Sequence, residues 1–285
     1  MMKFIAGISV LQDRYDAFIT DIWGVLHNGS TAYDGVIDCL GKLRDSGKKV
    51  LLLSNSGRRA KMVSSDLCGF GVMPELYSHL ITSGELTHHA FSGTRDSRLQ
   101  NLGTCYYLFG SERYGLTRGL GITKTDELSA AEFILTIGVE GNPSTTGIYE
   151  DRLRYSAQNG LTMVCANPDV TVNRNGVLGI GPGALAVYYE KLGGRVIYFG
   201  KPYEDIYNLS LDKLSGVAPR RILVIGDSMK TDIAGANRCG LDCLLVGTGV
   251  HWRELSTIPG DFHQLSALCQ TVNSFPTMIA KGFIW

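Results

Sequence analysis

Short apolar runs alternate with amphipathic stretches along most of this 285-residue chain. Continuous apolar runs suit strands that are covered on both faces of a sheet, because a strand with one wet face alternates apolar and polar residues instead. Strands that alternate with helices favour a mostly parallel sheet, so the sequence predicts an α/β fold whose core is a doubly wound, Rossmann-like sheet. The apolar runs lie at residues 16–21, 49–54, 78–83, 195–200, 221–227 and 242–247.

The segment between the first two runs predicts the first helix of this pattern. Val36, Leu40 and Leu43 fall on one face at helical spacing, and Gly47 stands where a helix commonly ends. Strand, helix and strand then form one βαβ unit.

The residues between about 87 and 193 form a second pattern of their own. They contain the strand-like runs TCYYLFG, AEFILTIG and LTMVCA, interleaved with helical stretches such as IYEDRLRYSAQNG. A segment of roughly 100 residues is large enough to bury its own core. We therefore expect a core domain at residues 1–86 and 194–285, interrupted by an inserted α/β domain at residues 87–193.

Charge and composition exclude several classes of function. Lysine and arginine total 27, aspartate and glutamate also total 27, and the sequence pI is about 7.0. This balance gives no bulk field that favours nucleic acid or an anionic membrane surface. The N-terminal stretch is a poor signal peptide and no apolar run is long enough to span a bilayer, so we expect a soluble cytoplasmic protein. Seven scattered cysteines without a C-x-x-C pair fit reduced thiols better than disulfides.

Polar side chains stand where four of the predicted strands end. Asp21 ends the first run, Ser54 and Asn55 end the second, and Lys201 and Asp227 stand at the ends of two later runs. A single aspartate at a strand end is most often a turn or helix cap. Because ligands of an open parallel sheet bind outside the carboxyl ends of its strands, four such positions at one edge indicate a binding site.

These residue types suit the chemistry of a phosphate monoester. The Asp21 carboxylate can attack phosphorus and form an aspartyl-phosphate. Asp21 and Asp227 offer the hard oxygen ligands that Mg²⁺ takes from proteins. Ser54 and the backbone amides that follow it offer a helix N-terminus to phosphoryl oxygens. Lys201 supplies a positive charge for the negative charge that develops in the reaction.

In this order the motifs resemble those of the haloacid dehalogenase superfamily, and specifically its class IIA phosphatases, the NagD-like and p-nitrophenyl-phosphatase-like members. DIWGVLHNG is similar to the nucleophile loop, LLLSNSGR to the serine/threonine motif, GKP to the lysine motif and GDSMKTDIAGA to the acidic motif. The resemblance spans nearly the whole chain and implies that residues 87–193 form an α/β cap that selects the substrate. By position it implies the nucleophile Asp21, the phosphate-binding residues Ser54 and Asn55, the orienting Lys201, the metal ligands Asp21, Asp227 and the backbone carbonyl of Trp23, and Asp232 as support of the metal site.

Trp23 departs from this family pattern, since most phosphatases of the superfamily carry a second aspartate there that protonates the leaving oxygen. General acid catalysis contributes about 10²–10⁴-fold, so esters with poor leaving groups are expected to turn over slowly. Three interpretations stay open: a preference for aryl or acyl phosphates, another proton donor such as His27, or binding without much turnover. We expect His27 rather to be a turn histidine that faces water, because no local sequence places it at the nucleophile. Trp23 is either a lid over the leaving group or a core-packing residue.

Other signals compete with this interpretation. GIGPGA at residues 179–184 fits a dinucleotide-binding glycine pattern, but the strand before it is short and Pro182 stands inside the loop. The resemblance makes Asn167 and Asp169, in the segment ANPD, candidate substrate contacts of the cap, although both residue types are common in plain turns. Asp232 is equally an acid in the first turn of a helix, where the helix dipole favours it.

The sequence therefore predicts a Mg²⁺-dependent phosphohydrolase that acts on a small phosphorylated metabolite, such as a sugar phosphate, through an aspartyl-phosphate. Two alternatives remain: a catalytically weakened protein that binds a phosphorylated ligand, and a metal-free dehalogenase of the same superfamily. Asp227 argues against the dehalogenase, because two close carboxylates need a cation to neutralise them. The cap carries no readable substrate code, neither nucleic acid nor membrane is expected as a partner, and a homodimer stays open.

Overall fold

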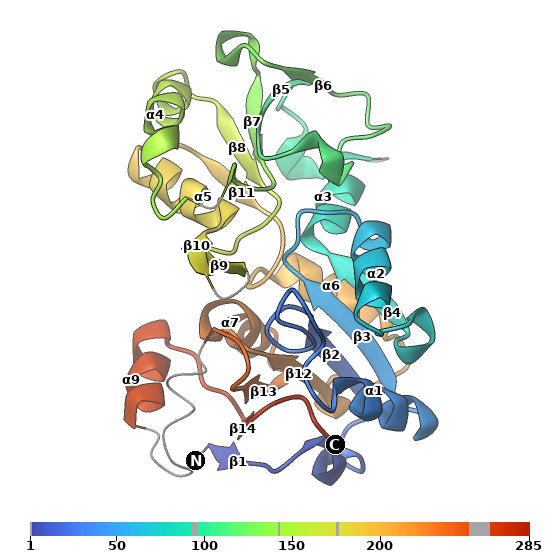
Figure 1. Ribbon diagram of the computed structural model, residues 1–285. Helices are drawn as coiled ribbons and strands as arrows, with labels where there is room; N and C mark the ends of the chain where they lie inside the picture. Colours follow the sequence, from blue (N-terminus) through green and yellow to red (C-terminus); the bar gives the residue numbers. More distant parts are fainter. Residues whose placement is uncertain (1, 93–95, 142, 175–176, 251–262) are drawn as a thin grey trace. The chain divides into compact units, whose positions relative to one another are not determined.

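The computed structural model describes residues 2–92, 96–141, 143–174, 177–250 and 263–285 (Figure 1). The contacts within the chain divide it into two compact units. Unit 1 comprises Met1–Ser54, Ser64–Ile81 and Lys201–Trp285, and unit 2 comprises Asn55–Val63 and Thr82–Gly200.

Unit 1 is built around a seven-stranded sheet with the strand order β1-β14-β13-β12-β2-β3-β4. The neighbouring pairs from β1 to β3 are all parallel. The chain moves outward from β2 to β4 on one side and from β12 to β14 on the other, so the winding reverses between β2 and β12. The strands are β1 (Lys3–Phe4), β2 (Ala17–Asp21), β3 (Lys49–Ser54), β4 (His79–Thr82), β12 (Ile222–Gly226), β13 (Asp242–Val246) and β14 (Met278–Ala280).

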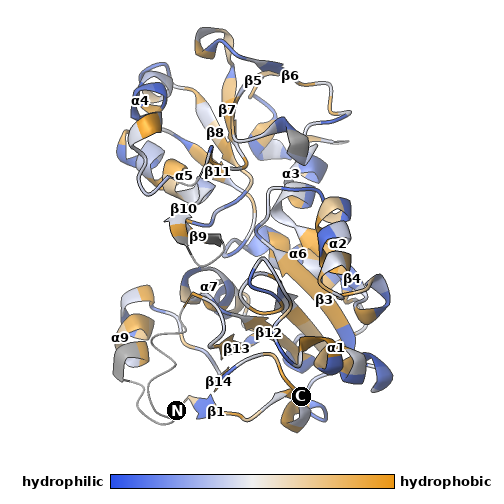
Figure 2. Cartoon of the chain, in the orientation of Figure 1, coloured by the Kyte–Doolittle hydropathy of each residue, from blue (hydrophilic) through white to orange (hydrophobic). Residues whose placement is uncertain are grey.

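The central strands form where the apolar runs were predicted, and they are covered on both faces. Every residue of β2 and of β12 is buried, and β3 is buried except for Lys49. The hydrophobic colouring of β3 along most of its length shows the same pattern (Figure 2). The predicted α/β class with a doubly wound, mostly parallel sheet is therefore confirmed.

Helices connect the strands of unit 1. The predicted first helix is confirmed as α1, which buries Val36, Cys39, Leu40 and Leu43 and contacts β3. Gly47 follows the helix with φ +70°, a conformation that a residue with a side chain rarely adopts. The helices are α1 (Val36–Asp45), α2 (Ala60–Gly69, which crosses the division at residues 63/64), α6 (Glu204–Lys213), α7 (Ala234–Arg238) and α9 (His263–Val272), with the π-helix η8 (Met229–Ile233) and the 3₁₀ turns η1 (Ile8–Leu11), η2 (Pro74–Leu76) and η7 (Pro219–Arg221).

Unit 2 has a five-stranded parallel sheet of its own, with the order β11-β8-β7-β5-β6. Its strands are β5 (Cys105–Phe109), β6 (Thr123–Thr125), β7 (Phe133–Thr136), β8 (Thr162–Cys165) and β11 (Val196–Tyr198), and β9 (Thr171–Arg174) pairs antiparallel with β10 (Val177–Ile180). Its helices are α3 (Ser83–Phe91), α4 (Glu150–Gln158) and α5 (Pro182–Lys191), with the 3₁₀ turns η3 (Ser97–Leu99), η4 (Glu112–Tyr114), η5 (Leu128–Ala130) and η6 (Gly147–Tyr149).

The two faces of this sheet bury separate hydrophobic clusters, because alternate residues of a strand point to opposite faces. On β7, Phe133 and Leu135 join a cluster that includes Phe91 of α3. Ile134, between them, joins the cluster that includes Leu153 of α4 and Leu185 of α5. Unit 2 therefore has a core of its own.

The strand β11 lies in a different sheet from the other apolar runs of the first pattern. It pairs with β8 at the edge of the sheet of unit 2, although the expected division assigned residues 194–200 to the core. The described units divide the chain at 54/55, 63/64, 81/82 and 200/201, whereas the sequence suggested 86/87 and 193/194. The pairing partner of an apolar run cannot be read from its composition.

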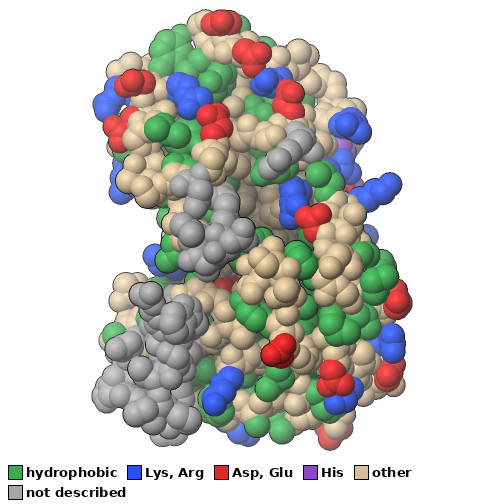
Figure 3. Space-filling view, viewed as in Figure 1, with side chains coloured by type: hydrophobic (Ala, Val, Ile, Leu, Met, Phe, Trp, Pro, Cys, Tyr) green, Lys and Arg blue, Asp and Glu red, His purple; other side chains and the backbone are tan. Residues whose placement is uncertain are grey.

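Several smaller expectations concern the surface and the thiols. All seven cysteines are free thiols. Among the described residues, no helix is long and apolar enough to cross a membrane. Basic and acidic side chains are interspersed on the visible face in Figure 3.

Candidate active site

The winding reversal of unit 1 gathers three of the predicted residues. Asp21 is the last residue of β2, Ser54 is the last residue of β3, and Asp227 directly follows β12. Because these strands are parallel neighbours in the order β12-β2-β3, their carboxyl ends lie at one edge of the sheet. Ligands of doubly wound sheets bind at this kind of position.

Lys201 joins the nucleophile candidate to Asp232. Its Nζ donates to Asp21 Oδ1 at 2.6 Å, to Asp232 Oδ1 at 2.7 Å and to the Leu53 carbonyl at 3.4 Å. The Lys201 side chain is almost fully buried, so these hydrogen bonds compensate the cost of taking its charge out of water.

Backbone amides hold the other two aspartates in place. Asp227 Oδ2 accepts from the Val250 N–H at 2.8 Å, and Asp232 Oδ2 accepts from the Ser228 N–H at 3.1 Å. Both side chains are buried. The sequence pattern singled out Asp227 and Asp232 but gave no signal for these donors, since any residue carries a backbone N–H.

Glycines make room for the carboxylates. A Cβ at Gly24, whose φ is +85°, would lie 2.3 Å from Asp227 Oδ2, and one at Gly249 would lie 1.7 Å from the same atom. A Cβ at Gly226 would lie 2.2 Å from the Asp232 Cβ. Close packing around the acids therefore explains why these three positions are glycine, and at Gly24 the positive φ is a second reason.

Burial raises the pKa of the clustered acids. The pKa of Asp21 lies well above its usual range, mainly because burial disfavours the charged form, with Asp232 and Asp227 adding repulsion and Lys201 opposing it. Burial likewise raises the pKa of Asp227 to about 7, with repulsion from Asp232 as the next cause. Three carboxylates share one ammonium here, so the site has a deficit of positive charge.

The donor set fits a divalent cation. One oxygen each of Asp21, Asp227 and Asp232 lie within 4.8 Å of one another. Carboxylate oxygens are the ligands that Mg²⁺ prefers, usually one or two from the protein. Both oxygens of Asp232 already accept hydrogen bonds, Oδ1 from Lys201 and Oδ2 from the Ser228 N–H, so Asp21 and Asp227 are the residues that would hold the metal.

Tyr207 supports the π-helix that carries Asp232, and sequence reasoning missed it. Its hydroxyl donates to the Asp232 carbonyl at 3.1 Å, and its ring packs where a Cβ at Gly235 would stand. Burial raises the pKa of Tyr207 well above its usual range, so the hydroxyl stays protonated as a donor. π-helical turns are frequent at functional sites.

Trp23 and His27 pack together in the loop after β2. The Trp23 ring lies edge-on to the His27 ring with centroids 5.1 Å apart, and it covers Gly29, where a Cβ would lie 2.3 Å from Trp23 Cη2. His27 also lies against Phe70, with centroids 4.6 Å apart, and its Nδ1 accepts from the Gly29 N–H at 2.9 Å. His27 is only 5% exposed, so the expectation of a histidine facing water is wrong.

Within unit 2 the structure pairs two of the predicted residues with each other. Asn55 Nδ2 donates to Asp169 Oδ1 at 2.8 Å. Asn167 Oδ1 accepts from the Asp169 N–H at 3.0 Å, which is the hydrogen bond of a turn led by asparagine. Phosphate binding by Asn55 and substrate contact by Asn167 and Asp169 stay predictions.

The glycines of GIGPGA serve packing against this turn. A Cβ at Gly181 would lie 2.0 Å from the Asp169 carbonyl oxygen, and one at Gly183 would lie 2.1 Å from that of Pro168. The preceding β10 is one strand of an antiparallel pair rather than of a βαβ unit. The competing dinucleotide-binding interpretation therefore lacks its structural context.

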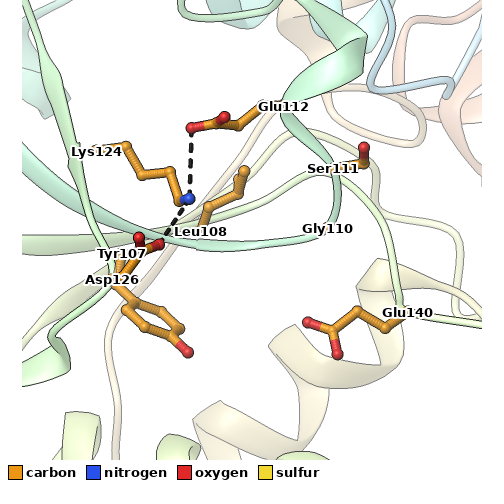
Figure 4. Close-up of a pocket in the computed structure, with 8 residues that line it drawn as sticks. All are labelled: Tyr107, Leu108, Gly110, Ser111, Glu112, Lys124, Asp126 and Glu140. Atoms are coloured by element: carbon orange, nitrogen blue, oxygen red, sulfur yellow. Dashed lines mark ion pairs between the residues drawn. The ribbon is translucent and has the colours of Figure 1, made fainter.

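Unit 2 also contains a polar pocket of about 380 Å³ (Figure 4). The Lys124 ammonium in it points between Asp126, at 2.7 Å, and Glu112, at 3.5 Å. The charge of Lys124 is thus neutralised within the pocket. This pocket contains none of the residues that the sequence singled out.

Comparison with known proteins agrees with this geometry. Residues 18–116 match the family described as haloacid dehalogenase-like hydrolase, and residues 198–265 match the family described as HAD-hydrolase-like. Chronophin from Bos taurus is 27% identical over 268 residues, which cover 86% of this chain and 85% of chronophin. A crystal structure of a haloacid dehalogenase-like hydrolase from Brucella suis 1330 is 29% identical, with a TM-score of 0.83 and coverage of 99% of this chain and 100% of that one.

A more distant structure shares the fold. Glycerol phosphate phosphatase Rv1692 from Mycobacterium tuberculosis, solved in complex with magnesium, is 22% identical with a TM-score of 0.66, over 87% of this chain and 74% of that one.

The core of the protein is a doubly wound sheet with clustered aspartates and a lysine at its strand ends. Together with these relatives, this arrangement defines a hydrolase of the phosphatase type. The chain belongs to the haloacid dehalogenase superfamily, within its class IIA phosphatases.

Proposed function

We propose that the protein is a Mg²⁺-dependent phosphohydrolase that cleaves a small phosphorylated metabolite through an aspartyl-phosphate at Asp21. The observation that carries this proposal is the buried cluster in which Lys201 contacts Asp21 and Asp232 while Asp227 lies beside them. Such a cluster combines a nucleophile, a fixed positive charge and two hard oxygen ligands. The magnesium in the mycobacterial relative supports the choice of metal.

In the first step, a carboxylate oxygen of Asp21 attacks phosphorus, and the bond from phosphorus to the ester oxygen breaks. Lys201 holds Asp21 Oδ1 and thereby fixes the direction of the carboxylate. Ser54, at the end of the neighbouring β3, is proposed to bind a phosphoryl oxygen. Bound Mg²⁺, held by Asp21, Asp227 and the carbonyl of Trp23, would supply positive charge that offsets the repulsion between the carboxylates and the phosphate.

In the second step, water attacks the phosphorus of the aspartyl-phosphate, which releases inorganic phosphate and restores the Asp21 carboxylate. The leaving oxygen of the first step needs a proton unless it is already a stable anion. The charged neighbours that most affect Asp21 are Lys201, Asp232 and Asp227, and each has a structural or metal-binding task. Trp23 offers no proton, so activated esters such as aryl and acyl phosphates are the favoured substrates.

The selection of the metabolite is proposed to reside in unit 2, which would act as the cap. Its own sheet and two cores make it large enough to present a binding surface. Sugar phosphates remain in the proposed substrate class beside activated esters, and the cytoplasm is the proposed compartment.

A second candidate function is favoured by the same tryptophan. A protein that keeps the phosphate and metal site but lacks the proton donor would bind a phosphorylated ligand with little turnover. A metal-free dehalogenase is disfavoured, because the buried carboxylates of Asp227 and Asp21 repel each other unless a cation neutralises the pair.

The test is hydrolysis of p-nitrophenyl phosphate, acetyl phosphate and a panel of sugar phosphates, with Mg²⁺ and with EDTA. Wild type is compared with Asp21→Asn, which keeps the shape of the nucleophile and removes its charge. Turnover that requires both Mg²⁺ and Asp21 supports the phosphohydrolase. Tight binding of vanadate without turnover favours the binding protein, and activity that survives EDTA contradicts both.

A further inference from the structure

The side chain of Asn55 is fixed at both ends inside unit 2. Its Nδ2 donates to Asp169 Oδ1 at 2.8 Å, and its Oδ1 accepts from Ser83 Oγ at 3.2 Å. Asn55 is 3% exposed and Ser83 is fully buried, so water competes little for these hydrogen bonds. The amide therefore has one defined orientation.

Asp169 is itself held rigidly. Its N–H donates to Asn167 Oδ1 at 3.0 Å, and its carbonyl accepts from the Gly183 N–H at 3.0 Å. Gly181 and Gly183 bring the N-terminus of α5 against this turn without a side chain between them. The Asp169 carboxylate, which accepts from Asn55, thus belongs to a well-packed turn.

The residues around the Asn55 side chain come from three segments, and each segment lies beside a point where the chain passes from one unit to the other. Asn55 follows the passage at 54/55, Ser83 follows the passage at 81/82, and Gly200 precedes the passage at 200/201. A Cβ at Gly200 would lie 2.1 Å from Ser83 Oγ and 2.7 Å from Asn55 Oδ1. Three separated segments are therefore packed together at one point of unit 2.

We infer that Asp169 is a positioning residue that acts through Asn55 on the phosphate-binding Ser54. Asn55 shares a peptide bond with Ser54, so an anchored Asn55 side chain restricts the rotation that sets the direction of the Ser54–Asn55 N–H. A phosphate-binding N–H must point at the ligand before the ligand arrives if it is to bind strongly. This role of Asp169 rests on the proposed function and differs from direct contact with the substrate.

The test exchanges the two side chains. Asn55→Asp places two carboxylates face to face, and we expect kcat/KM for p-nitrophenyl phosphate and the affinity for inorganic phosphate to fall by about tenfold or more. Asp169→Asn keeps an acceptor for Asn55 and is expected to be milder. In the double variant, the carboxylate introduced at position 55 can accept from the amide introduced at position 169. Both quantities should then recover toward the values of Asp169→Asn alone.

Each outcome separates positioning from the other roles. If the double variant is as impaired as the product of its single variants, Asp169 does not act through Asn55 and the inference is overturned. A second outcome is that the melting temperatures change, whereas kcat/KM and phosphate affinity stay the same when they are measured well below the melting range. In that case the pair is only structural and the inference is also overturned. Absence of turnover in wild type refutes the proposed function instead, and calorimetric binding of inorganic phosphate to the same four proteins then decides the role of the pair.

Discussion

The Lys201 ammonium contacts carboxylates from two different elements, Asp21 at the end of β2 and Asp232 in the π-helix η8. Replacing Lys201 by Met leaves these acids facing each other in a buried site. We expect kcat/KM to fall by about 10²-fold or more, because a fixed positive charge at the reacting centre is lost. Breaking a buried ion pair also costs about 3–5 kcal/mol of unfolding free energy, which thermal denaturation measures.

Lys124→Met is the matched control for this change. Lys124 also contacts two acids, Asp126 and Glu112, but its side chain is 30% exposed and lies in the separate pocket of unit 2. Loss of activity in both variants to the same degree would contradict the special role of Lys201.

Gly24→Ala is expected to damage the metal site. Gly24 and Gly47 both have positive φ, at +85° and +70°, so alanine strains the backbone at either position by about 1–3 kcal/mol. A Cβ at Gly24 also lies 2.3 Å from Asp227 Oδ2, whereas a Cβ at Gly47 meets nothing within 4 Å. Gly24→Ala should therefore lose affinity for Mg²⁺, measured by titration calorimetry, and turnover. Gly47→Ala should keep both, and equal losses would refute the role of Asp227 as a ligand.

The fold was predictable to the extent that local sequence determines it. The strands β2, β3, β12 and β13 formed where uninterrupted apolar runs occur, because burial on both faces leaves a clear compositional signal. The edge strand β4 also formed within a predicted run, although only its last two residues are buried. The run at residues 195–200 also became a strand, but its partner β8 placed it in the other sheet. Partner choice depends on contacts far apart in the sequence, which composition does not encode. The terminal strands β1 and β14 are short, at two and three residues, and were missed for that reason.

The candidate site was predictable where function requires a particular side chain at a strand end. Asp21, Ser54 and Asp227 follow apolar runs directly, so their shared edge could be inferred from the parallel sheet. The sequence could not predict the backbone N–H donors of Ser228 and Val250, or the Tyr207 hydroxyl that donates to the Asp232 carbonyl. None of these groups leaves a pattern in the sequence. The pairing of Asn55 with Asp169 was missed for the same physical reason, since 114 positions separate them.

Glu85 is expected to make stability depend on pH. Arg59 donates to its two carboxylate oxygens at 2.8 Å each, and the Ala60 N–H donates at 3.1 Å. The hydrogen bonds from Arg59 hold the pKa of Glu85 below its ordinary value of 4.5. A lowered pKa in the folded state means that the stabilisation is complete above the unfolded-state pKa and is lost as pH falls through the lower folded value.

Glu85→Gln should therefore lower the unfolding free energy by about 1 kcal/mol at pH 7, a value that solvent screening keeps small. The difference from wild type should shrink as the pH is lowered below 4.5, which urea denaturation at several pH values measures. Glu75→Gln, at an exposed position in η2, serves as the control. A difference that grows on acidification would show that the assigned direction of the pKa shift is wrong.

His27→Asn tests whether His27 donates the proton that Trp23 cannot. The Asn Oδ1 can replace His27 Nδ1 as the acceptor of the Gly29 N–H, so the loop keeps its hydrogen bond while the titratable ring is removed. Because His27 is buried between Trp23 and Phe70, we expect kcat/KM to stay nearly unchanged. Steady-state kinetics decides the matter, since loss of a general acid would lower turnover by about 10²–10⁴-fold. His27→Leu, which cannot accept from Gly29, should reduce thermal stability.

Trp23→Asp should widen the range of substrates. Trp23 is 37% exposed and lies in the loop after β2, so a smaller side chain uncovers Gly29 and one side of His27 but leaves the strands of the sheet in place. An aspartate at this position supplies the missing proton donor, and we expect kcat/KM for an alkyl phosphate such as glycerol phosphate to rise by about 10²-fold. Turnover of p-nitrophenyl phosphate should change little, because its leaving group departs as a stable anion. Trp23→Phe keeps an aromatic ring without a proton donor and should resemble wild type. An unchanged ratio of alkyl to aryl turnover in Trp23→Asp would mean that protonation of the leaving group does not limit the reaction.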